Sequence, residues 1–287
     1  MAEQNQITRK QHYIPEMYLK NFANENGKIF QYNLLYGNYK PVTPAQTGYA
    51  EFLYETQWKS SPEGEERFAL VNYLENYFSE REKIYNICIS SICKKIVDDT
   101  ASITEITKKE KMILAEFTTN IFLRHPNMMK LMGFDNFSSA EISDAHINHL
   151  KKIFGMDAET VLVFENKCKW LDSRFPGGYF QNVQKMFENM YLSFLVSGSI
   201  SFITCDWPII LAQVEGEIIA LLLPVSPKCC ICYTAFKTQN INYISDEMVV
   251  LYNKLHIEKK STRMKYLYAR NKEDIERLFE KSEEVLE

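Results

Sequence analysis

Helical spacing dominates the middle of the chain. After an acidic run at 63–66, apolar side chains recur every three or four positions from 68 to 96, which predicts an amphipathic helix. The acidic residues would lie in the first turn and Lys94 and Lys95 near the last, which suits the two ends of the helix dipole. The pattern therefore predicts one long helix that begins soon after Pro62.

Further helices are predicted up to residue 198. Thr107 and Glu110 have the spacing of a capping box before a second apolar periodic stretch, and this helix should end before Pro126. Helical spacing returns over 139–154, within 160–170, and from 179 to 196, where Gly198 would close the last helix. We therefore expect a helical section over residues 62–198.

Strand patterns lie on both sides of this section. Residues 28–33 alternate apolar and polar side chains after an Asn-Glu-Asn-Gly turn, and 34–61 reads as loop with room for one more strand. β-rich runs broken by turn residues cover 199–205, 208–213, 217–223, 228–234 and 264–269, with a hairpin at 214–217. Helices are expected again over 245–257 and 273–286.

This order of elements predicts an α+β fold. A mixed, mainly antiparallel sheet from the N-terminal and C-terminal thirds would pack against the helical middle section. The chain shows no internal repeat and no low-complexity linker, so we expect a single domain over residues 1–287.

Composition narrows the class of protein. With 46% hydrophobic and 24% charged residues among 287, the chain has the composition of a globular protein with a real core. The net charge of −4 argues against a protein that coats duplex nucleic acid with a broad basic face. The N-terminus lacks a signal-peptide pattern, no apolar run is long enough to span a membrane, and the seven cysteines are an odd number, so we expect a cytoplasmic protein with free thiols.

Common catalytic motifs and strong metal patterns are missing. The chain has no Gly-x-Gly-x-x-Gly, Walker loop, Gly-x-Ser-x-Gly or Cys-x-x-Cys. His146 and His149 could share one face of a helix, and Cys230 and Cys232 one face of a strand, but each pair lacks further ligands at a recognisable spacing. We therefore predict no metal site, and the sequence names no cofactor.

Three stretches of the chain resemble one family. They are Gln11-His12-Tyr13-Ile14-Pro15, Leu123-Arg124-His125-Pro126, and Thr204-Cys205-Asp206-Trp207-Pro208 with the later Leu223-Pro224-Val225-Ser226-Pro227. Their order and spacing resemble the bacterial family called domain of unknown function 4238. Two positions differ: Cys205 stands where that family usually has Ser, and His125 stands where it usually has Thr or Ser. The resemblance implies an α+β fold and implies no substrate or reaction.

The same stretches supply the candidate site. His12, Arg124 and Asp206 are polar residues in apolar or aromatic surroundings close to prolines. If the fold brings them together, His12 could act as acid or base, Arg124 could bind a phosphate or carboxylate, and Asp206 could orient the imidazole or bind a metal. We predict His12 and Asp206 as catalytic residues, and Arg124 and Tyr13 as substrate-binding residues.

Two functions are compatible with these residues. The first is a hydrolase that acts on a phosphate-bearing substrate, either a small molecule or nucleic acid. The alternative is a non-catalytic module that binds a ligand or a protein, in which His12, Arg124 and Asp206 anchor turns or fill the core. The first requires the three side chains to share one concave pocket, whereas the alternative places them apart.

Overall fold

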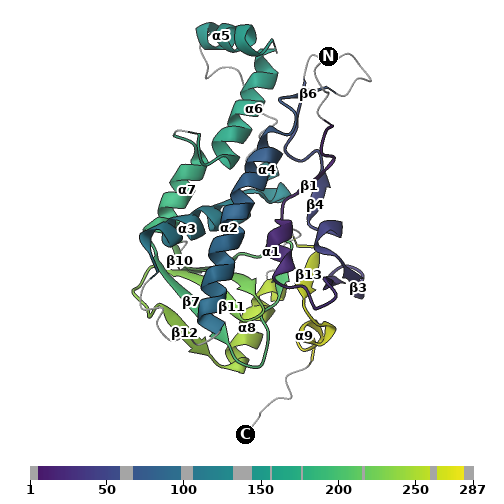
Figure 1. Ribbon diagram of the computed structural model, residues 1–287, viewed down its shortest axis with the longest axis vertical. Helices are drawn as coiled ribbons and strands as arrows, with labels where there is room; N and C mark the ends of the chain where they lie inside the picture. Colours follow the sequence, from purple (N-terminus) through teal and green to yellow (C-terminus); the bar gives the residue numbers. More distant parts are fainter. Residues whose placement is uncertain are drawn as a thin grey trace.

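The structure is a computed structural model, which describes residues 6–58, 67–97, 106–131, 144–155, 157–175, 177–214, 217–258 and 264–280. Its elements confirm the α+β class, with helices concentrated between residues 73 and 188. The strands form two main sheets, where the sequence had suggested one. Figure 1 shows the helices and the two sheets together.

The larger sheet comes from the C-terminal third of the chain. Its order is β12-β7-β11-β10-β9, and all neighbours are antiparallel except β12 and β7. Val214 pairs with Glu217, which confirms the predicted hairpin between β9 and β10. The strands are β7 (Tyr191–Ser197), β9 (Ile210–Val214), β10 (Glu217–Ser226), β11 (Cys229–Thr234) and β12 (Ile241–Ile244).

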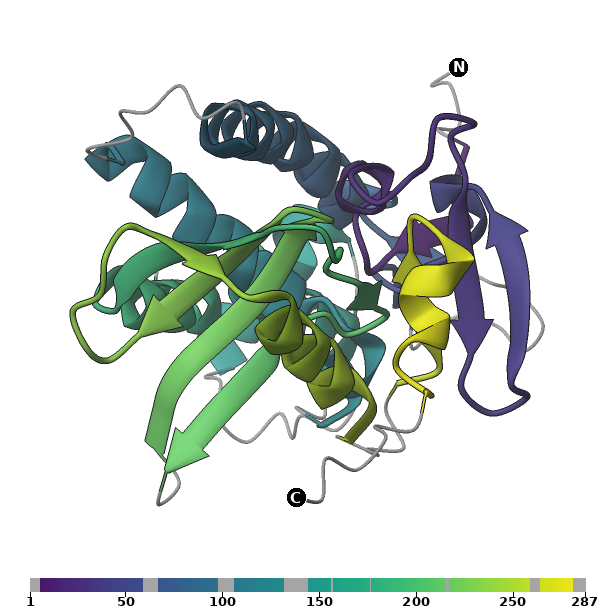
Figure 2. The same cartoon turned by 90° about the horizontal axis from the view of Figure 1, so that it is seen from below.

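Helices cover both faces of this sheet. One face packs against α2 (Tyr73–Val97), α3 (Lys108–Leu123) and α7 (Tyr179–Glu188), through a core that includes Ile92, Phe117 and Ile231. The other face packs against α8 (Asp246–Glu258), as Figure 2 shows from below. Cys230 and Cys232 belong to the α8 side and Cys229 to the opposite side, as strand alternation predicted.

The smaller sheet joins segments from opposite ends of the chain. Its order is β3-β2-β13-β8, all antiparallel. The sequence had predicted β2 and β13. The strands are β2 (Ile29–Asn33), β3 (Asn38–Val42), β8 (Thr204–Cys205) and β13 (Tyr266–Ala269), and α9 (Lys272–Glu276) packs on one face. In Figure 2 the β2–β3 hairpin lies at the outer edge of the molecule.

Short elements connect the N-terminal segment to both sheets. β1 (Lys10–His12) pairs with β4 (Tyr49–Glu51), and β5 (Thr56–Gln57) pairs with β6 (Phe68–Ala69). The helix α1 (Glu16–Lys20) and the 3-10 turn η1 (Pro44–Gln46) complete this region. On α1, the Tyr18 hydroxyl lies 2.6 Å from both the Thr204 hydroxyl and the Pro224 carbonyl, so α1 bridges the two sheets.

The remaining helices extend away from the sheets. They are α4 (Pro126–Leu131), α5 (Asp144–Phe154) and α6 (Ala158–Leu171), and Figure 1 shows α5 at one extreme of the molecule. Thr107 and Glu110 form the predicted capping box at the start of α3. Within the part of the chain that the structure describes, no helix is long and apolar enough to cross a membrane.

Three predicted helix boundaries were wrong. The helix expected over 273–286 ends at Glu276, and positions 281–286 lie outside the described residues. The long helix begins at Tyr73 rather than soon after Pro62, because Leu70 and Asn72 adopt positive φ angles and Phe68 belongs to a strand. The stretch from 191 to 197 is strand β7 rather than the end of a helix. All but the first of its residues are buried between two layers, and such a continuous apolar run cannot be told from a helix by periodicity.

Candidate functional site

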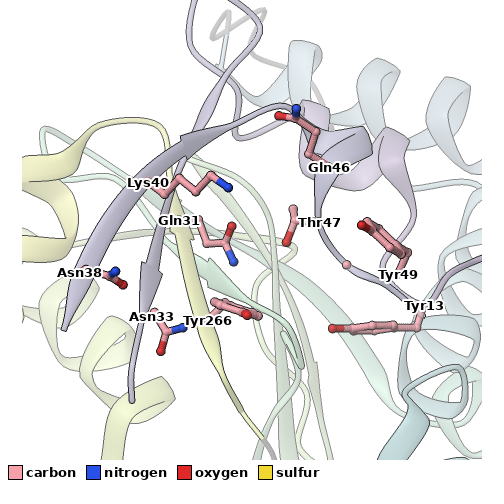
Figure 3. Close-up of a pocket in the computed structure, with 10 residues that line it drawn as sticks. Tyr13, Gln31, Asn33, Asn38, Lys40, Gln46, Thr47, Tyr49 and Tyr266 are labelled. Atoms are coloured by element: carbon pink, nitrogen blue, oxygen red, sulfur yellow. The ribbon is translucent and has the colours of Figure 1, made fainter. Parts of the chain in front are cut away.

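A polar pocket of about 430 Å³ lies on the face of the smaller sheet opposite α9. Its walls come from β2, β3, β13, the η1–β4 loop and the residue after β1. Figure 3 shows the side chains of these segments converging from several sides. The lining residues are Tyr13, Gln31, Asn33, Asn38, Lys40, Gln46, Thr47, Gly48, Tyr49 and Tyr266.

Strand register explains why one face of the sheet is polar. Tyr266 pairs with Asn33, which pairs with Asn38 on the next strand. Two residues along, Gln31 pairs with Lys40, so these side chains share the same face. The alternate positions, such as Leu267 and Tyr32, face α9 instead. The pocket is therefore one side of a sheet whose other side is core.

The η1–β4 loop is held close to the N-terminal segment. The Gly48 carbonyl accepts hydrogen bonds from the backbone N–H groups of Tyr13 at 2.8 Å and Ile14 at 3.1 Å. Gly48 has φ +69°, and a Cβ added there would lie 3.1 Å from the Ile14 Cβ. The Thr47 hydroxyl lies 2.8 Å from the Tyr268 hydroxyl on β13. These bonds fix the loop that forms one wall of the pocket.

The pocket carries positive charge and unused hydrogen-bonding groups. Lys40 is the single charged residue among those lining it. Within the described residues, the side chains of Gln31, Asn38 and Lys40 make no hydrogen bond or ion pair with the protein. The Lys10 ammonium also lies 4.9 Å from the centre of the Tyr49 ring. The chemistry of the walls thus favours a polar, neutral or anionic ligand.

Tyr13 is the predicted site residue that lines the pocket. Figure 3 shows its ring extending into the cavity toward Tyr266. Burial, together with the nearby carboxyl of Asp206, raises the pKa of the Tyr13 phenol, so it keeps its proton at neutral pH. Tyr13 can therefore donate a hydrogen bond to a ligand.

Asp206 lies behind this wall, directly after β8. It is 2% exposed, its backbone N–H donates to the Tyr266 carbonyl at 3.1 Å, and its Oδ2 accepts the Lys265 N–H at 2.9 Å. Its Oδ1 is buried without a partner among the described residues. Burial raises the pKa of Asp206 to about 7, and hydrogen bonds from backbone N–H groups, first that of Lys265, offset this only in part.

Arg124 lies outside the pocket and is 1% exposed. Its Nε donates to the Tyr54 hydroxyl at 2.9 Å, its Nη1 to Glu82 at 2.7 Å and Asn120 at 3.1 Å, and its Nη2 to the His12 carbonyl at 2.5 Å. Although burial opposes the charge, Tyr54 and Glu82 raise the pKa of Arg124. Four protein acceptors therefore occupy the guanidinium that was predicted to bind an anion.

The His12 imidazole is half-buried beside Tyr49. Its ring centre lies 5.6 Å from that of Tyr49, and its Nε2 is buried without a partner among the described residues. Burial and the Arg124 charge lower the pKa of His12, against a smaller opposing effect of Glu16 and Glu82. His12 does not line the pocket itself, and its imidazole reaches the pocket wall only through its contact with Tyr49.

The three motif stretches nevertheless meet in space. The Arg124 guanidinium binds the His12 carbonyl, and the next residue, His125, packs edge-on against Tyr13 at 5.3 Å. The other face of His125 stacks on Trp207 at 5.3 Å with an interplanar angle of 17°. The fold thus brings the stretches together through main-chain and ring contacts, while the side chains of His12, Arg124 and Asp206 point to different places.

The comparisons with known proteins agree with the resemblance noted from these stretches. The family model described as "Protein of unknown function (DUF4238)" matches residues 10–273. The chain belongs to the DUF4238 family. No curated protein and no solved structure matches this DUF4238 chain. The functional argument therefore rests on the site itself.

The described part of this DUF4238 protein contains no cluster of metal-ligating side chains. Within the described residues, no group of three or more His, Cys, Asp or Glu side chains could hold a metal ion. The side chain of His146 lies outside the described residues. All seven cysteines are free thiols; Cys93 is half-buried and the other six are buried.

Sequence reasoning missed most of the pocket of this DUF4238 protein. Gln31 and Asn33 lie at the polar positions of the alternation at 28–33, and that signal could have marked a polar sheet face. No local signal pointed to Lys40 or Tyr266. The one further strand allowed within 34–61 was not located, and β13 pairs with β2 from more than 200 residues away.

Proposed function

We propose that this protein binds a phosphate-bearing ligand, a nucleotide or nucleic acid, in the pocket on the smaller sheet. One observation carries the proposal: the pocket combines a lysine with amide and tyrosine side chains and has no carboxylate in its lining. Lys40 would pair with the phosphate, and the amides of Gln31 and Asn38 would hydrogen-bond the base or sugar. Tyr13 and Tyr266 offer aromatic surfaces and hydroxyl groups.

A binding titration with ATP, with adenosine as the phosphate-free comparison, tests this proposal. Lys40→Met should weaken ATP binding by about tenfold or more, which corresponds to about 1.4 kcal/mol, and should leave adenosine binding unchanged. Lys237→Met is the matched control, because Lys237 is also exposed and lies between β11 and β12, away from the pocket. Equal ATP affinity of wild type and Lys40→Met would contradict the proposal.

Hydrolysis of the bound ligand is the second candidate function, by a site other than the predicted one, because the side chains of His12, Arg124 and Asp206 do not share the pocket. It is favoured by the unpaired Oδ1 of Asp206, whose carboxyl has a pKa of about 7 and lies behind Tyr13. In this scheme the Tyr13 side chain contacts the substrate. The Asp206 carboxyl, which holds a proton, positions Tyr13. Release of inorganic phosphate from ATP by the wild-type protein would support hydrolysis if Tyr13→Phe and Asp206→Asn abolish it. Binding without release would support the non-catalytic module.

A further inference from the structure

The turn between β2 and β3 displays two apolar side chains to solvent. Leu35 is 78% exposed and Tyr36 is 75% exposed, and no other large hydrophobic residue of the described chain is more exposed. A Leu and a Tyr side by side at such exposure are unusual at a hairpin tip, where polar residues would cost less.

Hydrogen bonds hold the backbone of this turn in a defined shape. The Asn33 Oδ1 accepts the backbone N–H groups of Leu35 at 2.9 Å and Tyr36 at 3.1 Å. The Gly37 N–H donates to the Asn33 carbonyl at 2.8 Å, and Gly37 has φ +65°. Because the turn is bonded internally, a ligand that contacts Tyr36 would not have to order it first.

The exposed tip is continuous with the mouth of the pocket. Asn33 and Asn38, the residues that flank the turn, both line the pocket, and Figure 3 labels them at one end of it. A ligand longer than the pocket that left it beside Asn33 and Asn38 would next reach residues 34–37. Tyr36 then offers an aromatic surface just outside a site that already contains Tyr13 and Tyr266.

We propose that the ligand is single-stranded nucleic acid, with one nucleotide in the pocket and a neighbouring base stacked on Tyr36. This inference rests on the proposed function and extends it from a nucleotide to a strand. Proteins that bind single strands combine local positive charge with aromatic side chains on which successive bases stack. Lys40 and Lys10 supply the charge and Tyr36 the additional surface, which a mononucleotide would not use.

The experiment compares the affinity for a mononucleotide with the affinity for a short single-stranded oligonucleotide. The variants are Tyr36→Ala and Tyr36→Phe, and Tyr243→Ala is the matched control, since Tyr243 is 68% exposed and lies on β12 of the other sheet. Tyr36→Ala should weaken oligonucleotide binding by about fivefold or more while mononucleotide binding stays the same. Tyr36→Phe should retain the oligonucleotide affinity.

The outcomes separate the two proposals. If wild type binds the mononucleotide, but the oligonucleotide binds no more tightly or is unaffected by Tyr36→Ala, then the strand proposal is wrong and the nucleotide site stands. If wild type binds neither ligand, both proposals are wrong. An equal loss in Tyr36→Ala and Tyr243→Ala would also overturn a specific role for the hairpin tip.

Discussion

The interior around Arg124 and the pocket around Lys40 both gather polar side chains around one cation, but only in the pocket does that cation have no protein partner among the described residues. Arg124 is fully buried and its donors are used by Tyr54, Glu82, Asn120 and the His12 carbonyl. In the pocket, Lys40 has no bond or ion pair with the described residues. A buried arginine in a motif is thus engaged in holding segments together, while an exposed lysine without a motif is available to a ligand.

The two regions also differ in charge. Glu75 and Glu82 surround Arg124, whereas the pocket lining has no carboxylate. Burial raises the pKa of Glu75 to about 7, and its Oε2 has no partner among the described residues. The interior therefore balances one cation with nearby acids, and the pocket leaves its cation uncompensated. This contrast predicts that substitutions in the interior change stability and those in the pocket change binding.

The largest expected effect is on stability, from Arg124→Met. The change removes a fully buried guanidinium and leaves the half-buried Glu82 without its ion pair, and should lower the free energy of unfolding by about 3–5 kcal/mol. Urea unfolding measures this loss. Arg9→Met is the control, because the ion pair of Arg9 with Glu51 is exposed and should contribute at most about 1 kcal/mol. Similar losses in both variants would refute a structural role for Arg124.

The second-largest expected effect is a pH dependence of the free energy of unfolding, which comes from Asp206. The folded protein keeps this carboxyl protonated up to about pH 7, whereas the unfolded chain releases the proton near 3.8. The stabilisation that this group contributes is therefore present below pH 4 and is lost as the pH rises to about 7. The loss in the free energy of unfolding is roughly 4 kcal/mol, because each pKa unit corresponds to about 1.4 kcal/mol. Asp206→Asn should remove this loss, so that its stability relative to wild type increases from pH 5 to pH 8.

Unfolding of both proteins at the two pH values checks this prediction, because subtraction cancels the other titrating groups. The Asn side chain can still accept the Lys265 N–H, so the backbone contact to β13 is kept. Parallel pH profiles for wild type and Asp206→Asn would mean that Asp206 is ionised in the folded protein at neutral pH.

A smaller effect is expected at the loop that joins the two regions. Gly48→Ala places a side chain at φ +69° and against the Ile14 Cβ, so it should cost about 1–3 kcal/mol and also weaken ATP binding. Gly27→Ala is the matched control: φ is +68°, but an added Cβ meets nothing within 4 Å. If both variants lose the same stability and neither loses affinity, the close packing of Gly48 on Ile14 does not support the pocket.

The sequence alone determined what depends on local chemistry. The capping box at Thr107, the strand after the turn at 24–27 and the hairpin at 214–217 were all predictable, because each depends on residues a few positions apart. The family was also readable, since its motifs are short and contiguous. For the same reason the motif residues attracted attention as a candidate site.

Only the tertiary structure decided where those residues point. β7 became a central strand because layers on both sides bury it, and the pocket formed because β2 and β3 meet β13 from the other end of the chain. Such pairings depend on long-range burial and register, which leave no local pattern. The same long-range packing buries the Arg124 side chain and the Asp206 carboxyl and leaves Lys40 open to a ligand.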